Sequence, residues 1–82
     1  MRSVTLYARP GCHLCDEARE AILGLRGVVP PFELGEVDIE RDDGLLARYL
    51  ERIPVVVVDG EVVSELELEV DSLRAVLDTV SR

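Results

Sequence analysis

The only two cysteines of the chain lie in the segment Cys12-His13-Leu14-Cys15. The thiolate is the reactive form of cysteine, and a helix N-terminus stabilises it through unpaired backbone N–H groups and the helix dipole. The two-residue spacer brings both sulfurs within bonding distance in one helical turn. We predict that Cys12 is an exposed nucleophile in the first turn of a helix, and that Cys15, on the apolar face, is the resolving thiol.

Charged neighbours adjust this thiol chemistry. Arg9 precedes Cys12 by three residues and supplies a fixed positive charge. Asp16 and Glu17 oppose that charge, and His13 adds to it only when protonated. We interpret His13 as an exposed spacer residue that contacts substrate rather than as a catalytic base.

A pair of cysteines at this spacing has two other uses. It can be half of a zinc site, but a closed structural zinc site needs four ligands, and the chain offers two Cys and one His. It can also form a structural disulfide, but such a short loop restrains the unfolded chain weakly, and cytosolic thiols stay reduced. The redox interpretation is therefore favoured, and no metal ligand is assigned.

Four strands and three helices are predicted around this motif. The strands, indicated by β-branched and apolar runs with turn signals between them, span residues 3–8, 32–39, 55–58 and 61–64. The helices, indicated by apolar residues at helical spacing, span residues 12–26 with Gly27 as cap, residues 44–51, and a segment that begins at an N-cap, Asp71. Residues 65–70 fit either more strand or an early helix start.

Apolar residues at helical spacing also predict which face of each later helix is buried. These residues are Leu46, Tyr49 and Leu50 in the second helix, and Leu73, Val76, Leu77 and Val80 in the third.

The element order β-α-β-α-β-β-α predicts a single α/β domain over residues 1–82, built on one four-stranded mixed sheet. The first two strands should be parallel, and Asp59-Gly60 should close a hairpin between the last two. The cysteine motif follows the first strand. It therefore lies at the carboxyl edge of the sheet, where α/β proteins place their sites.

The segment Arg52-Ile53-Pro54 precedes the unbroken valine strand. Proline cannot donate to a sheet ladder, so Pro54 must lie at the first strand position or at an edge. A trans proline would simply begin the strand. A cis Ile53-Pro54 bond would instead turn the Ile53 backbone toward the cysteine motif, where its free N–H and C=O could pair with an extended substrate.

Composition excludes several classes of function. Seventeen acidic and nine basic residues give a net charge of −8, and aromatic residues make up 4% of the chain. The chain thus has neither the basic footprint nor the stacking platform that nucleic-acid binding needs. Its apolar runs are far shorter than the roughly 20 residues that span a bilayer, and its first residues do not follow the signal-peptide pattern. We expect a cytoplasmic monomer that binds neither nucleic acid nor membrane.

Over nearly its whole length the chain resembles the glutaredoxin-like branch of the thioredoxin superfamily. The resemblance rests on the Arg9–Cys15 segment between strand and helix, on Val37-Asp38-Ile39, and on Ile53-Pro54 before an apolar strand and hairpin. Short bacterial glutaredoxin-like proteins with a Cys-x-Leu-Cys-Asp motif are similar. The absence of Trp before Cys12 favours this branch over thioredoxin itself.

The resemblance implies a thioredoxin fold and a cis Pro54. It implies that Cys12 attacks and Cys15 resolves. It also implies that Arg9 assists the thiolate and binds the glycine carboxylate of glutathione, while the Ile53 backbone pairs with the cysteine of glutathione.

One segment departs from the glutaredoxin pattern. Glutaredoxins carry a Gly-Gly turn and a nearby Asp that hold the γ-glutamyl end of glutathione. This chain has Ser64-Glu65 at that place, and Asp71 comes several residues later. A Glu65 carboxylate pointing inward would repel the γ-glutamyl carboxylate.

We therefore predict a small thiol–disulfide oxidoreductase that acts on protein or small-molecule disulfides through Cys12 and Cys15. Its predicted substrate contacts are Arg9, His13, Ile53 and Pro54. It would require no bound cofactor, and glutathione or a thioredoxin-type reductase would re-reduce it. Two alternatives are a metal or iron–sulfur binding module that uses the cysteines, and a non-catalytic thioredoxin-fold adapter that binds peptides at the Ile53 edge.

Overall fold

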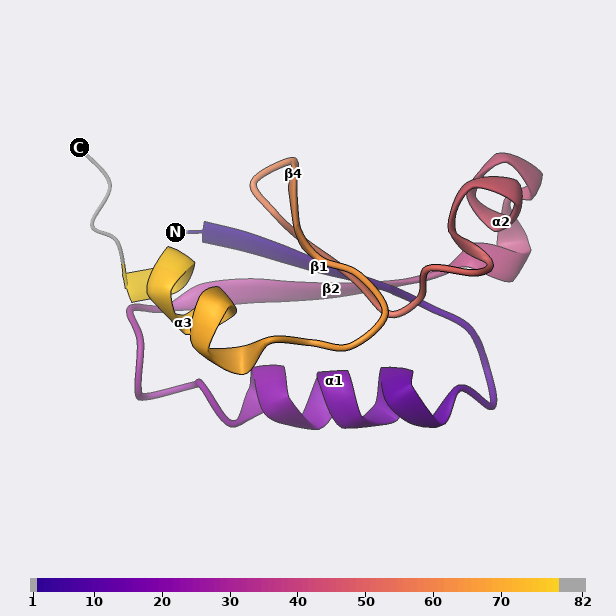
Figure 1. Cartoon of the computed structure of the whole chain (residues 1–82). Coiled ribbons are helices and arrows are strands. Elements are labelled where there is room, and N and C mark those ends of the chain that lie inside the picture. Colours follow the sequence, from indigo (N-terminus) through magenta and orange to yellow (C-terminus); the bar gives the residue numbers. More distant parts are fainter. Residues whose placement is uncertain (1, 79–82) are drawn as a thin grey trace.

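The computed structural model describes residues 2–78. Its strands are β1 (Arg2–Ala8), β2 (Phe32–Asp38), β3 (Val55–Val58) and β4 (Glu61–Ser64), and its helices are α1 (His13–Leu23), α2 (Asp43–Tyr49) and α3 (Val70–Asp78), with a 3-10 turn, η1 (Ile39–Arg41), before α2. The predicted α/β class and order of elements are confirmed (Figure 1). Within the described residues, no helix is long and apolar enough to cross a membrane.

The four strands form one mixed sheet in the order β2-β1-β3-β4, which confirms the predicted sheet. β1 runs parallel to β2, with Arg2 opposite Phe32 and Ala8 opposite Asp38, and antiparallel to β3. β3 and β4 form the expected hairpin, in which Asp59 (φ 51°) and Gly60 (φ 91°) both take positive φ. β1 is therefore a central strand whose carboxyl end leads into the cysteine motif.

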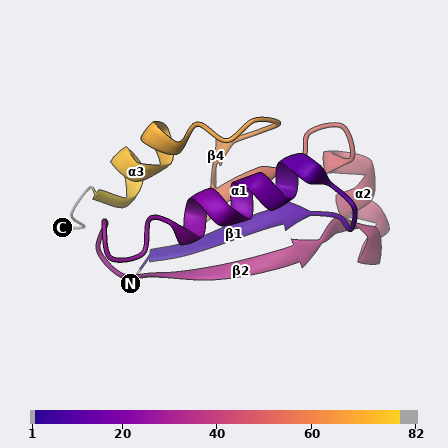
Figure 2. The same ribbon diagram turned by 90° about the horizontal axis from the view of Figure 1, so that it is seen from below.

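Helices lie on both faces of this sheet. α1 runs along β1 and β2 on one face, whereas α2 lies on the opposite side, at the end of the sheet where β1 and β2 finish (Figures 1 and 2). Alternate valines of β3 enter two apolar clusters: Val56 and Val58 pack with α1 and α3, and Val55 and Val57 pack with Ile39 and Tyr49. The valine strand is thus buried on both faces, as predicted.

Helix α1 ends three residues earlier than predicted, at Leu23 instead of Arg26. Gly24 is its C-cap, and the Gly24 N–H donates to the Glu20 carbonyl at 2.9 Å. The next two amides donate to carbonyls only three residues back, at 3.0 and 3.1 Å, so the chain tightens out of the α-helix. Glycine is a poor helix former, which explains an end at Gly24 although Leu25 is still buried on the same side.

Helix α2 is also shorter than predicted, and the prediction of its buried face is partly wrong. Asp42 caps it by accepting from the N–H groups of Gly44 (2.8 Å) and Leu45 (3.1 Å), so the helix begins at Asp43. It ends at Tyr49, which is buried. Leu50, predicted on the buried face, lies beyond that end and is 42% exposed.

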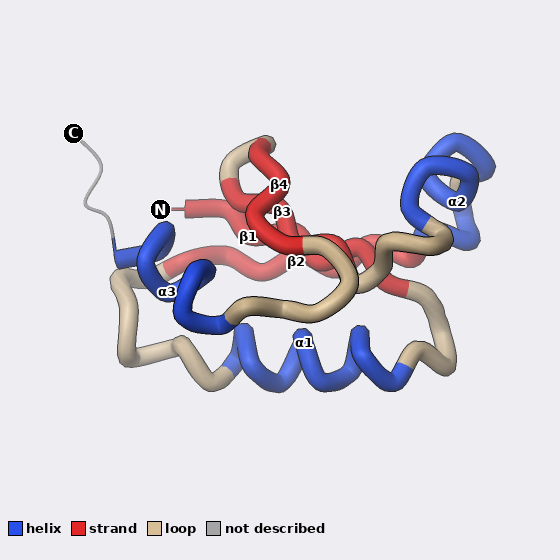
Figure 3. Tube along the Cα trace, viewed as in Figure 1, coloured by secondary structure: helices blue, strands red, loops and turns tan. Residues whose placement is uncertain are grey.

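Helix α3 begins at Val70, so the predicted N-cap, Asp71, lies inside its first turn. Leu73 and Leu77 are buried and Val76 is half-buried, as the spacing predicted, whereas Val80 lies outside the described residues. Residues 65–69 are neither strand nor helix but an irregular loop that leads from β4 to α3 along α1 (Figure 3).

Candidate redox site

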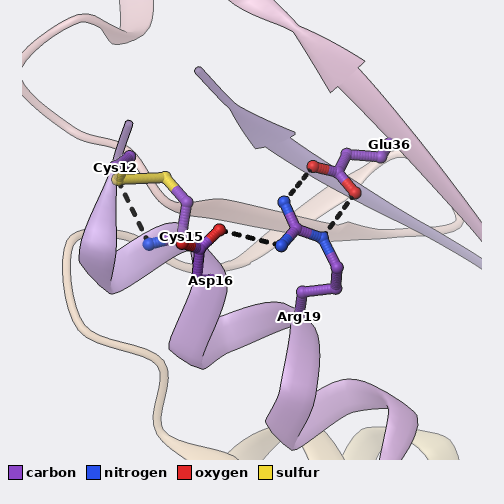
Figure 4. Close-up of polar contacts among 5 residues, drawn as sticks. All are labelled: Cys12, Cys15, Asp16, Arg19 and Glu36. Atoms are coloured by element: carbon purple, nitrogen blue, oxygen red, sulfur yellow. Dashed lines mark hydrogen bonds and ion pairs between the residues drawn. A yellow bond between two sulfur atoms is a disulfide. The ribbon is translucent and has the colours of Figure 1, made fainter. Parts of the chain in front are cut away.

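Cys12 is the N-cap of α1, directly after the turn that ends β1. Its Sγ accepts a hydrogen bond from the Cys15 N–H at 3.1 Å and is joined to the Cys15 Sγ in a disulfide (Figure 4). The two Cα atoms are 5.2 Å apart. Gly11 supplies the preceding turn with a φ of 78°, a conformation that suits glycine.

The two cysteines differ in burial. Cys15 is fully buried in the cluster beneath α1, whereas Cys12 is half-buried. The prediction of an exposed Cys12 within the first helical turn is therefore wrong in two details: Cys12 stands one position before that turn and is not fully exposed. Its extended φ and ψ of −90° and 108° make it the N-cap, and the disulfide ties its sulfur to a partner inside the core.

Arg9 pairs with a carboxylate at the same edge of the sheet. One guanidinium nitrogen, Nη2, lies 3.1 Å from Oε2 of Glu40 on η1, and both side chains are 41% exposed. Sequence reasoning missed Glu40. The available signal was that the carboxyl ends of parallel strands meet at one edge, which brings the residues after β1 beside the residues after β2.

His13 points into solvent at the start of α1. Its side chain is 85% exposed, and its Nε2 lies 2.8 Å from Oε2 of Glu17 one turn later. This placement agrees with an exposed spacer within the motif, and its role toward substrate stays a prediction.

A charge network that sequence reasoning did not identify joins α1 to β2 (Figure 4). Arg19 donates to both carboxylate oxygens of Glu36, with Nε 2.8 Å from Oε1, and to Oδ1 of Asp16 at 2.9 Å. Hydrogen bonds from Arg19 lower the pKa of Glu36, and the hydrogen bonds to Glu36 and Asp16 raise the pKa of Arg19. In the register of β1 with β2, Glu36 lies beside Leu6, so it faces α1 from an edge strand, and no local sequence pattern gives that register.

The network borders a polar cleft of about 480 Å³ next to the cysteine motif. Its lining residues are Ala8, Arg9, Pro10, Gly11, Asp16, Arg19, Glu36, Asp38 and Arg41. Each of the three arginines has a carboxylate at 4.0 Å or less, so the charges of the cleft balance internally.

A larger groove of about 920 Å³ lies between the strand starts and the α1–β2 connection, and Arg26 and Glu33 are its only charged lining residues. Its position at the amino-terminal ends of β1 and β2 separates it from the disulfide.

The Ile53-Pro54 bond is cis, which confirms the implication of the resemblance. Pro54 is buried, and Ile53 is half-buried. The expectation of a free Ile53 N–H is wrong, because this N–H donates to the Tyr49 carbonyl at 3.0 Å. The last carbonyls of a helix lack partners within the helix, and Tyr49 at the end of α2 accepts from both Arg52 and Ile53.

Ser64 and Glu65, which replace the expected Gly-Gly turn, both make contacts within the protein. The buried Ser64 hydroxyl donates to the Glu67 carbonyl at 3.1 Å. The Glu65 carboxylate lies 3.5 Å from Nη1 of Arg52. Leu66 donates its N–H to the Arg52 carbonyl at 2.8 Å, which fastens the loop after β4 beside the cis proline.

Over residues 2–78, no cluster of three or more His, Cys, Asp and Glu side chains is arranged to hold a metal ion.

Comparison with known proteins identifies relatives of the whole arrangement. Residues 3–78 match the glutaredoxin-like domain (DUF836) family. The glutaredoxin-like protein YDR286C homolog of Dictyostelium discoideum is 26% identical over 85 residues, which cover 98% of this chain and 79% of that protein. The X-ray structure of the structural genomics target protein XcR50 from X. campestris matches with a TM-score of 0.74 and 35% identity, over 95% of this chain and 99% of that chain.

A more distant match defines the fold. A mutant thioredoxin from Halobacterium salinarum NRC-1 matches with a TM-score of 0.66 and 20% identity, over 94% of this chain and 72% of that chain. The fold is therefore a thioredoxin fold, as the resemblance implied, and the cysteine pair at the start of α1 fits a redox role. By its match over residues 3–78, the chain belongs to the glutaredoxin-like domain (DUF836) family.

Proposed function

We propose that the protein is a thiol–disulfide oxidoreductase that uses Cys12 as the attacking thiol and Cys15 as the resolving thiol. One observation carries the proposal: a half-buried cysteine at the N-cap of α1 is bonded to a fully buried cysteine one turn later. A reversible bond between an accessible and a protected cysteine is the arrangement that two-step disulfide exchange needs.

Local geometry supports Cys12 as the nucleophile. The N-cap position faces the unpaired N–H groups and the positive end of the helix dipole, both of which favour a thiolate. The Cys15 N–H already donates to the Cys12 sulfur at 3.1 Å, and the same donor would stabilise a negative charge there after reduction.

In the reducing direction, the Cys12 thiolate attacks one sulfur of a substrate disulfide. A mixed disulfide forms, and the other substrate sulfur leaves as a thiolate that takes a proton from water. Cys15 then loses its proton to water and attacks the Cys12 sulfur, which releases the second substrate thiolate and forms the Cys12–Cys15 disulfide. In total, two electrons pass from the cysteine pair to the substrate. The proton that Cys15 gives to water balances the proton that the first substrate thiolate takes up, and the second substrate sulfur stays a thiolate, as Cys12 was at the start. Two thiols, from glutathione or from a dithiol reductase, restore the reduced pair and are themselves oxidised to a disulfide.

The proposed substrate contacts are Arg9, His13, Ile53 and Pro54. Arg9 is exposed enough to exchange Glu40 for a substrate carboxylate, and His13 lies on the solvent side of the motif. Ile53 and Pro54 would border the bound substrate, with the Ile53 carbonyl as the acceptor for an extended backbone. The Ile53 N–H would have to leave the Tyr49 carbonyl before it could also take part.

The test is turnover of a disulfide substrate with glutathione, and separately with a thioredoxin-type reductase, as the reductant. We expect Cys12→Ser to reduce turnover to the uncatalysed rate. We expect Cys15→Ser to accumulate a mixed disulfide with the substrate, which mass spectrometry detects. Wild-type turnover no faster than that of Cys12→Ser would refute the proposed activity.

A further inference from the structure

We propose that a groove beside the disulfide docks the polypeptide that carries the substrate disulfide, and that it selects a cysteine flanked by apolar and basic side chains. The groove lies between α1 and residues 65–69, and we call it the loop groove. This inference rests on the proposed function, because disulfide exchange at Cys12 gives the docked polypeptide its purpose.

The loop groove is small and mostly apolar. Its volume is about 240 Å³, and its apolar lining consists of Leu14, Ala18, Ala21, Leu66, Leu68 and Val70. Leu14, Leu66 and Val70 are 44%, 54% and 36% exposed. The loop runs alongside α1 in the ribbon and in the tube (Figures 1 and 3). Apolar side chains gathered in a concave surface mark an interaction site better than scattered ones do.

Both walls of the loop groove reach the redox site. Leu14 forms part of one wall and stands between the two bonded cysteines in the chain. The other wall is tied to the cis proline segment, because the Leu66 N–H donates to the Arg52 carbonyl and Glu65 pairs with the Arg52 guanidinium. A polypeptide whose sulfur approaches Cys12 would therefore place its neighbouring side chains at this groove.

The loop wall is preformed and holds an unfavourable backbone conformation. Leu66 has a φ of 66°, in the left-handed region where a bulky side chain is an outlier. Hydrogen bonds from Leu66 to Arg52 and from Ser64 to Glu67 fix this shape. The result is a leucine side chain directed outward, with more than half of its surface exposed, which core packing does not explain.

Charge complementarity identifies the occupant. Glu17 and Glu67 line the loop groove, and Glu65 and Glu69 lie in the same loop. Glu17 pairs with His13 and Glu65 with Arg52. The carboxylates of Glu67 and Glu69 have no ion-pair partner within the part of the chain that the structure describes. An apolar surface with unpaired negative charges at its border fits a leucine-like side chain beside Lys or Arg.

The same features disfavour glutathione as the preferred substrate. Glutathione carries two carboxylates against one ammonium group and has no apolar side chain for the groove. Like charges at an interface lower the association rate and the affinity. The loop groove therefore selects a protein or peptide disulfide over glutathione disulfide.

The experiment compares two peptide disulfides of equal length, each a symmetric dimer with one cysteine per strand. In one, the cysteine is flanked on both sides by Leu and then Lys; in the other, Glu replaces each Lys. We expect kcat/KM for the basic peptide to exceed that for the acidic peptide about tenfold at low salt, and the ratio to fall as salt is added. Hydroxyethyl disulfide, which has no side chains, reports the exchange chemistry alone.

Two variants and two matched controls assign the preference to the loop groove. Leu66→Asn keeps a residue that tolerates positive φ but removes the apolar contact. It should lower the ratio of basic-peptide to hydroxyethyl-disulfide kcat/KM about tenfold. Leu23→Asn, at an exposed leucine of α1 (43%) that does not line the loop groove, should leave that ratio unchanged. Glu67→Gln with Glu69→Gln should reduce the basic-over-acidic preference about threefold. Glu33→Gln with Glu61→Gln, which makes the same change in net charge elsewhere, should not.

Equal kcat/KM for the two peptides, or equal loss of preference in the groove variants and their controls, overturns the docking proposal. A separate measurement distinguishes it from the proposed function: titration of the oxidised protein with the basic peptide in which Ser replaces the cysteine. Binding that Leu66→Asn weakens supports the loop groove even if hydroxyethyl disulfide is not turned over, which would refute only the enzyme activity. Absence of binding, with hydroxyethyl disulfide turned over, refutes only the docking site.

Discussion

The two sides of α1 that flank the disulfide use their side chains differently. On the side of β2, Arg19 binds both oxygens of Glu36 and also Asp16, so the charges of this network satisfy one another. On the side of residues 65–69, Leu66 is more than half exposed and held at positive φ. The first side is arranged as a structural contact between helix and sheet, and the second as a surface that a ligand completes.

This difference assigns stability to one side of α1 and substrate recognition to the other. The Arg19 network anchors the helical turn that follows Cys15 to an edge strand, while the loop groove leaves the opposite side of the same turns accessible. Substitutions on the network side should therefore change the free energy of unfolding, and substitutions on the groove side should change substrate preference with little cost in stability.

The largest stability effect is expected for Arg19→Met. Methionine keeps the length of the side chain but removes the bidentate contact to Glu36 and leaves two carboxylates without their cation. Arg19 and Glu36 are about one-third to two-fifths exposed, so solvent screening discounts the interaction. We expect the free energy of unfolding, measured by urea denaturation, to fall by about 1.5 kcal/mol.

Arg74→Met is the matched control for this substitution. Arg74 pairs with Asp78 at 3.6 Å within α3, across one helical turn and with both side chains about half exposed. Such a pair contributes about 0.3–0.5 kcal/mol. If Arg19→Met destabilised the protein no more than Arg74→Met, the network could not be regarded as an anchor between helix and sheet.

The sequence was sufficient to predict the fold but not the contacts on these two sides of α1. Local patterns were enough to predict three features, and the structure confirms each of them. These are the buried valine strand, the Asp59-Gly60 hairpin and the buried face of α1 from Cys15 to Ile22. Arg19 and Glu36 are 17 residues apart, and their pairing depends on the register of β1 with β2, which no local pattern states. The conformation of Leu66 likewise depends on a hydrogen bond to Arg52.

Helix ends were the other source of error, and they have a physical reason. Apolar residues at helical spacing continue past both helix ends. Leu25, two residues after the end of α1, is still buried, whereas Leu50, one residue after the end of α2, is apolar but exposed. Periodicity indicates the apolar face of a segment, whereas a helix end is decided by where backbone amides find their acceptors.

A smaller effect should appear in the pH dependence of stability. The hydrogen bonds from Arg19 lower the pKa of Glu36 below its usual value of 4.5, while the Arg19 guanidinium stays charged throughout. A carboxyl whose folded pKa is depressed stabilises the fold fully above its unfolded pKa and loses that contribution as pH falls through the folded pKa. Wild type should therefore lose about 1 kcal/mol more than Glu36→Gln between about pH 6 and pH 2.

The two proteins share every other titrating group, including Asp59, whose pKa is lowered chiefly by the Ser3 N–H. The difference between their urea denaturation curves across pH thus isolates Glu36. Curves that stay parallel from neutral to acid pH would show that Glu36 gains no net stabilisation from Arg19.

The smallest effect is expected on the groove side, for Leu66→Gly. Glycine removes the penalty of a left-handed leucine but adds backbone entropy to the unfolded chain, and these terms oppose each other at about 1 kcal/mol each. Because the Leu66 side chain is 54% exposed, little apolar burial is lost. We expect the free energy of unfolding to change by no more than about 0.5 kcal/mol.

Leu50→Gly is the control for this substitution. Leu50 is 42% exposed but has right-handed φ and ψ of −50° and −41°, where glycine should lower the free energy of unfolding by about 1 kcal/mol. Equal destabilisation by the two substitutions would mean that the Leu66 side chain stabilises its own loop, and the contrast between an anchored side and an open side of α1 would then be lost.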